Sequence, residues 1–439
     1  MDKFLIKTYG CQMNERDSEK MAALLKRLGY TETETLEEAD LIIFNTCCVR
    51  GKAEDKVFGH LSRIKNIKES RPDLLVALCG CMPQQKSLEE KIRTSYKFID
   101  IVFGTSNRHL LPEFIHRAKA TGKQVFDVSE NFDQEITDID LTERVYKYKA
   151  GVNIMQGCNN FCAYCIVPYV RGPERSRTPE DLLNEVTALT KDGATEIMLL
   201  GQNVNSYKGL DNQGKEINFT GLLAFLSANA PLLRDIRFMT SHPKDFSDEL
   251  INEIQVNDKI CKHIHLPLQS GSTKVLNEMN RIYTKEDYLS LAAKLKKAVP
   301  NIALSTDIIV GFPGETEGDF EDTLDVVKKV RFSGAFTFIY SKREGTPAAD
   351  RTDEVPRDVS AERFERLTKE VYDIMNEINQ SKIGCTIEVK VEEAGETTKA
   401  RSNDHTLVHF TSSNNFNAGD VTKVKITEAK TFYLLGSEV

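Results

Sequence analysis

The sequence lacks a hydrophobic run long enough to span a bilayer, and residues 1–5 contain no apolar core of the kind that a secretory signal needs. We therefore expect a cytoplasmic chain with no membrane partner. The sequence also lacks an excess of positive charge: 58 Lys and Arg residues stand against 66 Asp and Glu residues, and the formal net charge is −8. Bulk electrostatics do not indicate a nucleic-acid binder, so any such binding would depend on local basic patches.

What is present is a chain of 439 residues with 40% hydrophobic and 28% charged residues, which is ordinary for a soluble globular protein of two or three domains. It contains ten cysteines. In a chain expected in the cytoplasm, that number indicates metal or redox chemistry more than disulfides.

Three of the cysteines, Cys158, Cys162 and Cys165, lie in one short loop with the spacing Cys-x3-Cys-x2-Cys. The next cysteine, Cys261, is far downstream, so no fourth thiol is close in sequence. Structural zinc sites are closed by four protein ligands, whereas three thiolates with an open position suit an iron–sulfur cluster that has one accessible iron. A zinc loop, a buried cysteine cluster or another thiophilic metal stays open on spacing alone.

Residues 1–145 alternate between strand and helix patterns. Apolar runs at residues 3–9, 40–45, 74–78 and 99–103 predict strands, and residues 18–28 and a stretch ending near residue 70 predict helices. Such alternation predicts a Rossmann-like parallel sheet covered on both faces.

Cys11, Cys47 and Cys81 each follow one of the first three predicted strands. Because sites in parallel sheets form beyond the carboxyl ends of the strands, we expect these three thiols to meet at one edge. Each cysteine taken singly would be an ordinary core residue. We interpret the neighbouring Cys48 and Cys79 as bystanders.

Residues 123–149 read as a connector, with an acidic stretch from 127 to 143. A second strand–helix series then runs to about residue 345, with Thr178 as a predicted helix cap. Its six strands are too few for a full eight-stranded barrel, so we predict a partial (β/α)6 barrel with its site at the carboxyl ends of the strands. The predicted strands are residues 151–155, 196–200, 235–239, 263–266, 302–310 and 335–340.

Polar residues follow these strands, and as a set they predict a binding site for a small polar molecule. They are Gln202 with Asn203, Ser241 with His242, Gln269 with Ser270, Asp307 with Gly311, and Ser341 with Arg343. Each one alone could belong to a solvated turn.

The C-terminal part begins with a predicted helix at residues 357–382, which has apolar residues at helical spacing. Alternating runs at residues 386–391, 407–410 and 421–426 follow, separated by turn residues, and predict a small all-β barrel. Barrels of this kind often bind RNA.

Several long motifs together resemble the radical S-adenosylmethionine (SAM) methylthiotransferases over essentially the full length. They are Thr-Tyr-Gly-Cys-Gln-Met-Asn at residues 8–14, Asn-Thr-Cys-Cys-Val-Arg at 45–50, Gly-Cys-Met at 80–82, the stretch from 156 to 177, and residues 338–349. Tyr164, before the last loop cysteine, matches the family's aromatic position. The resemblance implies an N-terminal methylthiotransferase domain at 1–145, a radical SAM domain at 146–375 and a C-terminal TRAM barrel at 376–439.

The resemblance also implies two 4Fe–4S clusters, a radical SAM cluster on Cys158, Cys162 and Cys165 and an auxiliary one on Cys11, Cys47 and Cys81. SAM would bind the first cluster near Tyr164, Gln202, Asn203, Gln269, Ser270, Asp307 and Gly311. The implied reaction adds a methylthio group to C2 of isopentenyladenosine next to the anticodon of tRNA, with sulfur from the auxiliary cluster and a second SAM as methyl donor.

Implied partners are that tRNA, an electron donor such as flavodoxin or ferredoxin, and iron–sulfur assembly proteins. We expect Arg171, Arg175 and Arg177 to contact RNA phosphates, with a weaker set of candidates on the second predicted helix: Arg50, Lys52, Lys56, Arg63, Lys65 and Lys68. Three alternatives stay open: a methylthiotransferase for threonylcarbamoyladenosine tRNA, one for a ribosomal-protein aspartate, or a non-catalytic metal- and RNA-binding protein.

Overall fold

The computed structural model describes residues 2–48, 51–129, 144 and 146–439, without the side chains of residues 51–55. It divides into two compact units. The first comprises Met1–Arg144, Met155–Arg175 and Arg343–Ala349, and the second comprises Val145–Ile154, Ser176–Lys342 and Asp350–Val439. The loop with Cys158, Cys162 and Cys165 therefore belongs to the same unit as the N-terminal domain.

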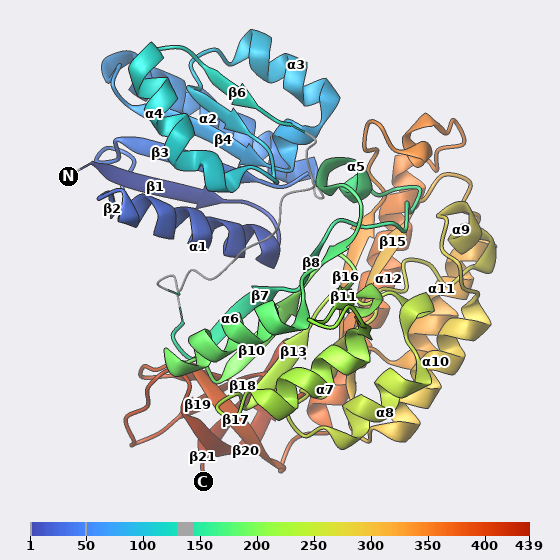
Figure 1. The fold of residues 1–439 in the computed structure, drawn as a ribbon. Coiled ribbons are helices and arrows are strands. Elements are labelled where there is room, and N and C mark those ends of the chain that lie inside the picture. Colours follow the sequence, from blue (N-terminus) through green and yellow to red (C-terminus); the bar gives the residue numbers. More distant parts are fainter. Residues whose placement is uncertain (1, 49–50, 130–143, 145) are drawn as a thin grey trace. The chain divides into compact units, whose positions relative to one another are not determined.

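The N-terminal domain is built on a six-stranded, all-parallel sheet in the order β2-β1-β3-β4-β5-β6 (Figure 1). β3 and β4 lie at its centre and are buried along their whole length, as their apolar sequences predict. The strands are β1 Lys3–Thr8, β2 Thr31–Glu32, β3 Leu41–Thr46, β4 Leu75–Gly80, β5 Ile101–Phe103 and β6 Val125–Asp127. The short edge strands β2 and β6 were not expected from the sequence.

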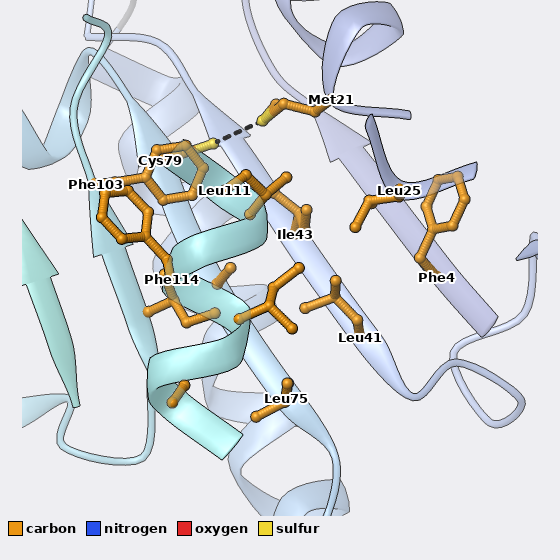
Figure 2. Close-up of a cluster of buried hydrophobic side chains, with 14 of the residues drawn as sticks. Phe4, Met21, Leu25, Leu41, Ile43, Leu75, Cys79, Phe103, Leu111 and Phe114 are labelled. Carbon is orange, nitrogen blue, oxygen red and sulfur yellow. Dashed lines mark hydrogen bonds between the residues drawn. The ribbon is translucent and has the colours of Figure 1, made fainter. Parts of the chain in front are cut away.

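Helices cover both faces of this sheet, which confirms the expected architecture. One face packs against Met21 and Leu25 of α1 and Phe114 of α4, and Cys79 lies in this core beside Met21 (Figure 2). The other face packs against α2 and α3 through Leu61 and other apolar residues. The helices are α1 Gln12–Arg27, α2 Gly51–Ser70, α3 Lys86–Ser95 and α4 Leu111–Thr121. α1 begins at Gln12, six residues before its predicted start, so Cys11 is its N-cap residue.

The second unit contains the six predicted barrel strands as two three-stranded parallel sheets, β7-β10-β13 and β14-β15-β16. A parallel bridge between Ile236 and Ile260 connects β13 to the segment before β14. Among the described strands β7 and β16 are edges, so the partial, open barrel is confirmed. The strands are β7 Lys149–Asn153, β10 Glu196–Leu200, β13 Asp235–Phe238, β14 His263–His265, β15 Ala303–Val310 and β16 Gly334–Ile339.

Six helices accompany these strands. They are α6 Pro179–Lys191, α7 Phe219–Asn229, α8 Asp248–Val256, α9 Thr273–Glu278, α10 Lys285–Ala298 and α11 Glu317–Val330. The predicted cap is present, since Thr178 Oγ1 accepts a hydrogen bond from the amide of Asp181 at 3.2 Å. A hairpin of β11 Lys208–Leu210 and β12 Glu216–Asn218 was not expected.

The C-terminal segment forms a closed barrel in the order β17-β18-β19-β21-β20, as the alternating pattern predicts. Its strands are β17 Thr386–Glu393, β18 Thr398–Ser402, β19 Leu407–Thr411, β20 Val421–Ala429 and β21 Tyr433–Glu438. α12 Arg357–Gln380 precedes it, and the expected domain boundary at 375/376 falls inside this helix. Among the described residues, no helix is both long and apolar enough to cross a membrane.

The barrel joins the central strands through charged contacts at the start of β10 and β13. Lys390 Nζ lies 3.2 Å from Glu196 Oε2 and also pairs with Asp235. Arg237 binds Glu196 and donates to the carbonyl oxygens of Ser402 and Asn403. These contacts lie at the amino ends of the strands, so they leave the carboxyl ends, where barrel sites form, uncovered by them.

Candidate functional site

Backbone hydrogen bonds fold the Cys158–Cys165 loop back on the segment that follows it. The amide of Cys158 donates to Gly172 O at 3.1 Å, and the amide of Cys165 donates to Cys162 O at 2.9 Å. Asn159 and Glu174 tie the same two stretches together with reciprocal bonds between backbone amide and side-chain oxygen. Backbone hydrogen bonds and the side chains of Asn159 and Glu174 therefore fix the geometry of the loop.

Burial differs among the three thiols of this loop. Cys158 and Cys162 are buried, whereas Cys165 and the neighbouring Tyr164 are half-buried. Burial raises the pKa of Cys158 to about 11. The loop also contacts the late motif at residues 338–349, because the Ala348 amide donates to Ala163 O at 2.8 Å. A motif nearly two hundred residues downstream thus supports the three-cysteine loop directly.

The turns that carry Cys11, Cys47 and Cys81 meet around one side chain, Asn14 of α1. Asn14 Nδ2 donates to Tyr9 O and to Thr46 O, both at 2.9 Å. Thr46 O also accepts the Cys81 amide at 3.0 Å. These bonds join the ends of β1, β3 and β4, so the three cysteine-bearing turns lie together at the carboxyl edge of the sheet. Asn14 belongs to the motif at residues 8–14, but no local pattern in the sequence indicates this role.

Two glycines allow this close approach. Gly10 has φ +120°, and a Cβ there would lie 2.3 Å from Cys47 Cβ. Gly80 has φ +95°, and a Cβ there would lie 2.3 Å from Thr46 O. Both positions combine a backbone conformation that favours glycine with a space that admits no side chain.

The thiols of this group differ from the core thiols in their ionisation. A hydrogen bond from Cys47 lowers the pKa of Cys11 to about 5, and a hydrogen bond from Cys48 lowers the pKa of Cys81 to about 7. Arg171 contributes to both shifts. Burial raises the pKa of Cys79 well above its usual range, which agrees with its expected role as a bystander. Cys48, by contrast, forms a hydrogen bond with Cys81 and lies in the same buried cluster, so it is in contact with one of the three expected ligands.

Arg171, predicted to contact RNA, is buried at the end of α5 Val167–Arg171. Its Nη2 donates to Asn14 Oδ1 at 3.1 Å and lies 3.6 Å from Asp17 Oδ2. Val170 of the same short helix and Ile166, its N-cap residue, pack against Cys48 and Cys81. The two cysteine groups are therefore parts of one compact unit, connected through α5.

Arg177 is also buried, and it pairs with Asp181 at 2.7 Å and Glu185 at 2.5 Å. Both side chains are enclosed and each donates to a protein acceptor, so neither guanidinium group is presented on the surface for an RNA phosphate. Arg175 is half-buried and stays a candidate. In the helix α2 set, Lys68 pairs with Asp100, Arg63 is exposed, and Arg50 and Lys52 lie outside the described residues and side chains.

The carboxyl ends of the first three barrel strands present buried polar atoms that no described residue satisfies. They are both side-chain polar atoms of Asn153 at the end of β7, Oδ1 of Asn203 after β10, and Oγ of Ser241 after β13. Buried polar atoms are normally hydrogen-bonded, so this set indicates a polar ligand. Asn153 was missed because it lies in the middle of the predicted strand 151–155, whereas the observed β7 ends at this residue. A polar residue within an otherwise apolar run was the available signal.

The other predicted contacts at the barrel mouth divide into two kinds. Asp307 is half-buried and lies 3.4 Å from His265 Nε2. Gln269 has φ +66° and bridges to Ile308, so its backbone completes the sheet. Ser270 is buried beside Thr323, and Gly311 packs against Ser360. Ser270 and Gly311 are therefore held in structural contacts, whereas Asp307 stays a ligand candidate. Gln202 is half-buried at the same end.

Curated relatives match the whole chain. A tRNA-2-methylthio-N(6)-dimethylallyladenosine synthase of Lachnoclostridium phytofermentans is 50% identical over 438 residues, which are 99% of this chain and 94% of that relative. The enzyme of the same name from Clostridium novyi is 51% identical, over 99% of this chain and 96% of that relative. The chain belongs to this family. It is thus a member of a family of radical SAM methylthiotransferases, and the expected resemblance is confirmed.

Family models and solved structures agree with this assignment. Residues 152–327 match the Radical SAM superfamily, and residues 3–104 match the uncharacterized protein family UPF0004. Among solved structures, the radical SAM methyltransferase TsrM from Kitasatospora setae aligns with a TM-score of 0.58 at 14% identity, covering 80% of this chain and 74% of TsrM. At that identity the likeness supports the fold alone.

The radical SAM superfamily uses a 4Fe–4S cluster and SAM, and the residues present fit both. Cys158, Cys162 and Cys165 form a three-thiolate donor set on a loop fixed by its own backbone. The unsatisfied atoms of Asn153, Asn203 and Ser241 suit a small polar molecule. Within the described residues, no His, Cys, Asp or Glu side chains form a group of three placed to hold one metal ion. A 4Fe–4S cluster does not require such a group, because its three thiolates bind three separate iron atoms. The fit to the cluster therefore rests on the three thiols of Cys158, Cys162 and Cys165.

Proposed function

We propose that this chain adds a methylthio group to C2 of N(6)-dimethylallyladenosine, also called isopentenyladenosine, in tRNA. The observation that carries the proposal is the full-length identity of about 50% to relatives that bear this activity in their name. The two groups of three cysteines support it, since this reaction requires both a radical source and a source of sulfur.

In this proposal Cys158, Cys162 and Cys165 hold the radical SAM cluster, with Tyr164 beside it. Asn153, Asn203, Ser241 and Asp307 bind the polar groups of SAM, and Gln202 and Gln269 line the same end of the barrel. When bound, the cluster and SAM supply a 5′-deoxyadenosyl radical, which can take hydrogen from an unactivated aromatic carbon. No acid or base side chain can break an unactivated aromatic C–H bond directly. The role of the chain in this proposal is therefore to orient SAM and to exclude water.

Cys11, Cys47 and Cys81 hold a second, auxiliary 4Fe–4S cluster in this proposal. When bound, that cluster supplies the sulfur that joins C2, and a second SAM supplies the methyl group. The fit rests on the three thiols at one sheet edge and on the lowered pKa of Cys11 and Cys81, since thiolates are the ligands that iron requires.

The substrate base must leave its stack in the anticodon loop to reach a buried site, at a cost smaller in a loop than in a duplex. We propose that the C-terminal barrel and Arg175 contact the tRNA. An electron donor such as flavodoxin or ferredoxin supplies the reducing electron, and iron–sulfur assembly proteins load the two sites.

The test is an anaerobic reaction of the reconstituted chain with SAM and dithionite. One tRNA substrate carries dimethylallyladenosine, a second carries threonylcarbamoyladenosine, and nucleosides are read by mass spectrometry. We expect a methylthio product from the first substrate alone. A product from the second alone would overturn the substrate assignment but leave the chemistry. The variant Cys158→Ala/Cys162→Ala/Cys165→Ala is the control and should form neither product nor 5′-deoxyadenosine.

A further inference from the structure

Arg171 is a buried cation that borders the auxiliary cysteine group, and Asp17 is the carboxylate beside it. A guanidinium stays protonated in proteins, and a buried charge is costly unless it is paired. Only 4% of Arg171 is exposed. Its Nη2 binds Asn14 at 3.1 Å and lies 3.6 Å from Asp17, while Nη1 is buried without a hydrogen-bond acceptor among the described residues.

The carboxylate nearest Arg171 is shared with a second arginine. Arg108 Nη1 lies 2.6 Å from Asp17 Oδ2, closer than the 3.6 Å between Asp17 and Arg171. Asp17 can neutralise about one positive charge, so Asp17 alone does not neutralise both arginines, and the thiols of Cys11 and Cys81 also act on Arg171. Asn14 Oδ1, which accepts the hydrogen bond from Arg171 Nη2, also lies 3.7 Å from Cys11 Sγ. Burial alone would lower the pKa of Arg171, but Cys81, Asp17 and Cys11 raise it.

The position of Arg171 also links the two cysteine groups. It lies six residues after Cys165, and its hydrogen-bond acceptor is Asn14, whose amide holds the turns before Cys11 and Cys47. A single side chain therefore extends from the helix that follows the radical SAM loop into the auxiliary cysteine group.

We propose that Arg171 is a positioning residue that keeps a buried positive charge beside the cluster on Cys11, Cys47 and Cys81 and thereby raises its reduction potential. The inference rests on the proposed function, which assigns a cluster to these cysteines. One-electron reduction, with the electron from an external reductant, makes a thiolate-bound cluster more negative by one charge. A fixed cation nearby stabilises that reduced form more than the oxidised one.

The test measures the potential of the auxiliary cluster by itself. The parent protein is the full chain with Cys158→Ala/Cys162→Ala/Cys165→Ala, reconstituted anaerobically, and the reduced cluster is followed by electron paramagnetic resonance during a redox titration. We expect Arg171→Gln to disfavour the reduced form about tenfold, which is about 59 mV for one electron. Arg171→Lys, which keeps the charge, should restore most of the difference.

Asp17→Asn provides a measurement of opposite sign. It removes the carboxylate that partly offsets Arg171, so the potential should rise, whereas a purely structural role of the network would not give shifts of opposite sign. The matched control is Arg16→Gln. Arg16 is as buried as Arg171, lies beside Asp17 on α1, and has its charge paired with Glu19. Its potential should stay close to that of the parent.

The outcomes separate this inference from the proposed function. A parent protein that binds no iron would overturn the auxiliary cluster itself. A parent that binds iron and an Arg171→Gln variant with the same potential would overturn only the role of Arg171. If Arg171→Gln fails to hold iron, Asp17→Asn decides: an unchanged or lowered potential would reject the proposal.

Discussion

Asn14 Nδ2 donates a hydrogen bond to the carbonyl oxygen of Thr46 at 2.9 Å, and the same oxygen accepts the amide of Cys81. This single acceptor joins α1, the end of β3 and the end of β4. Together with the hydrogen bond from Asn14 to Tyr9 O, it couples the three turns that carry cysteines to one another.

We expect Asn14→Ala to destabilise the N-terminal domain by about 2 kcal/mol, because one buried and one partly buried carbonyl oxygen lose a donor. Iron bound by the variant without Cys158, Cys162 and Cys165 should fall by more than half. Asn107→Ala is the control: Asn107 is also buried and donates to Asp127 O in the same domain. It should lose similar stability but keep its iron. Equal iron in the two variants would contradict the role given to Asn14.

Gly80→Ala should abolish the auxiliary site. The new Cβ would lie 2.3 Å from a backbone oxygen, in a conformation with φ +95°, so we expect a loss of roughly 3 kcal/mol or more. Gly29→Ala shares a positive φ of +85° but meets no atom within 4 Å, and should cost only about 1 kcal/mol. Thermal unfolding and iron content would be measured for both. The prediction fails if the two variants behave alike.

Cys47→Ser should lose the auxiliary iron, whereas Cys48→Ser should keep it. Cys48 is fully buried against Ile166 and Val170, and a serine there costs about 1 kcal/mol for an added polar group without changing the three proposed ligands. Iron and sulfide would be counted in the variant that lacks the radical SAM cysteines. Loss of iron in Cys48→Ser would show that Cys48, which contacts Cys81, is itself a ligand.

The C-terminal barrel should lose stability in acid through Asp404. Burial by itself would raise the pKa of this carboxyl. Lys382 at 2.7 Å and hydrogen bonds from Ser402 and Thr406 outweigh that effect and lower the pKa to about 2. Because the folded pKa lies below the ordinary value of 3.8, the stabilisation is present above about pH 4. About 2 kcal/mol is lost as the pH falls from about 4 to about 2.

Asp404→Asn tests this directly. The wild type should be more stable than the variant at pH 6, and the difference in unfolding midpoint should shrink at pH 3. A difference that is the same at both pH values would show that Asp404 does not titrate with folding. Lys399→Gln is a suitable control, since Lys399 is exposed on the same barrel.

Much of the fold could be predicted from the sequence because it depends on local patterns. The apolar runs of β3 and β4 and the alternation in β17 and β20 indicate buried parallel strands and barrel strands. The short strands β2 and β6 were not predicted, because two or three residues are too few to show an alternating pattern. The spacing of Cys158, Cys162 and Cys165, and the place of Cys11, Cys47 and Cys81 after strands, are also local features.

Only the tertiary structure decided which polar residues face a ligand and which support the protein. Arg171 and Arg177 look alike in the sequence, as basic residues that follow the cysteine loop. Packing buries both, one beside the thiols and the other between Asp181 and Glu185. Charge type is a property of a residue, but burial and partner depend on contacts distant in the chain. The sequence by itself determined the cysteine sets and the family, and the long-range contacts of Asn14 and Arg171 determined how the auxiliary set is held.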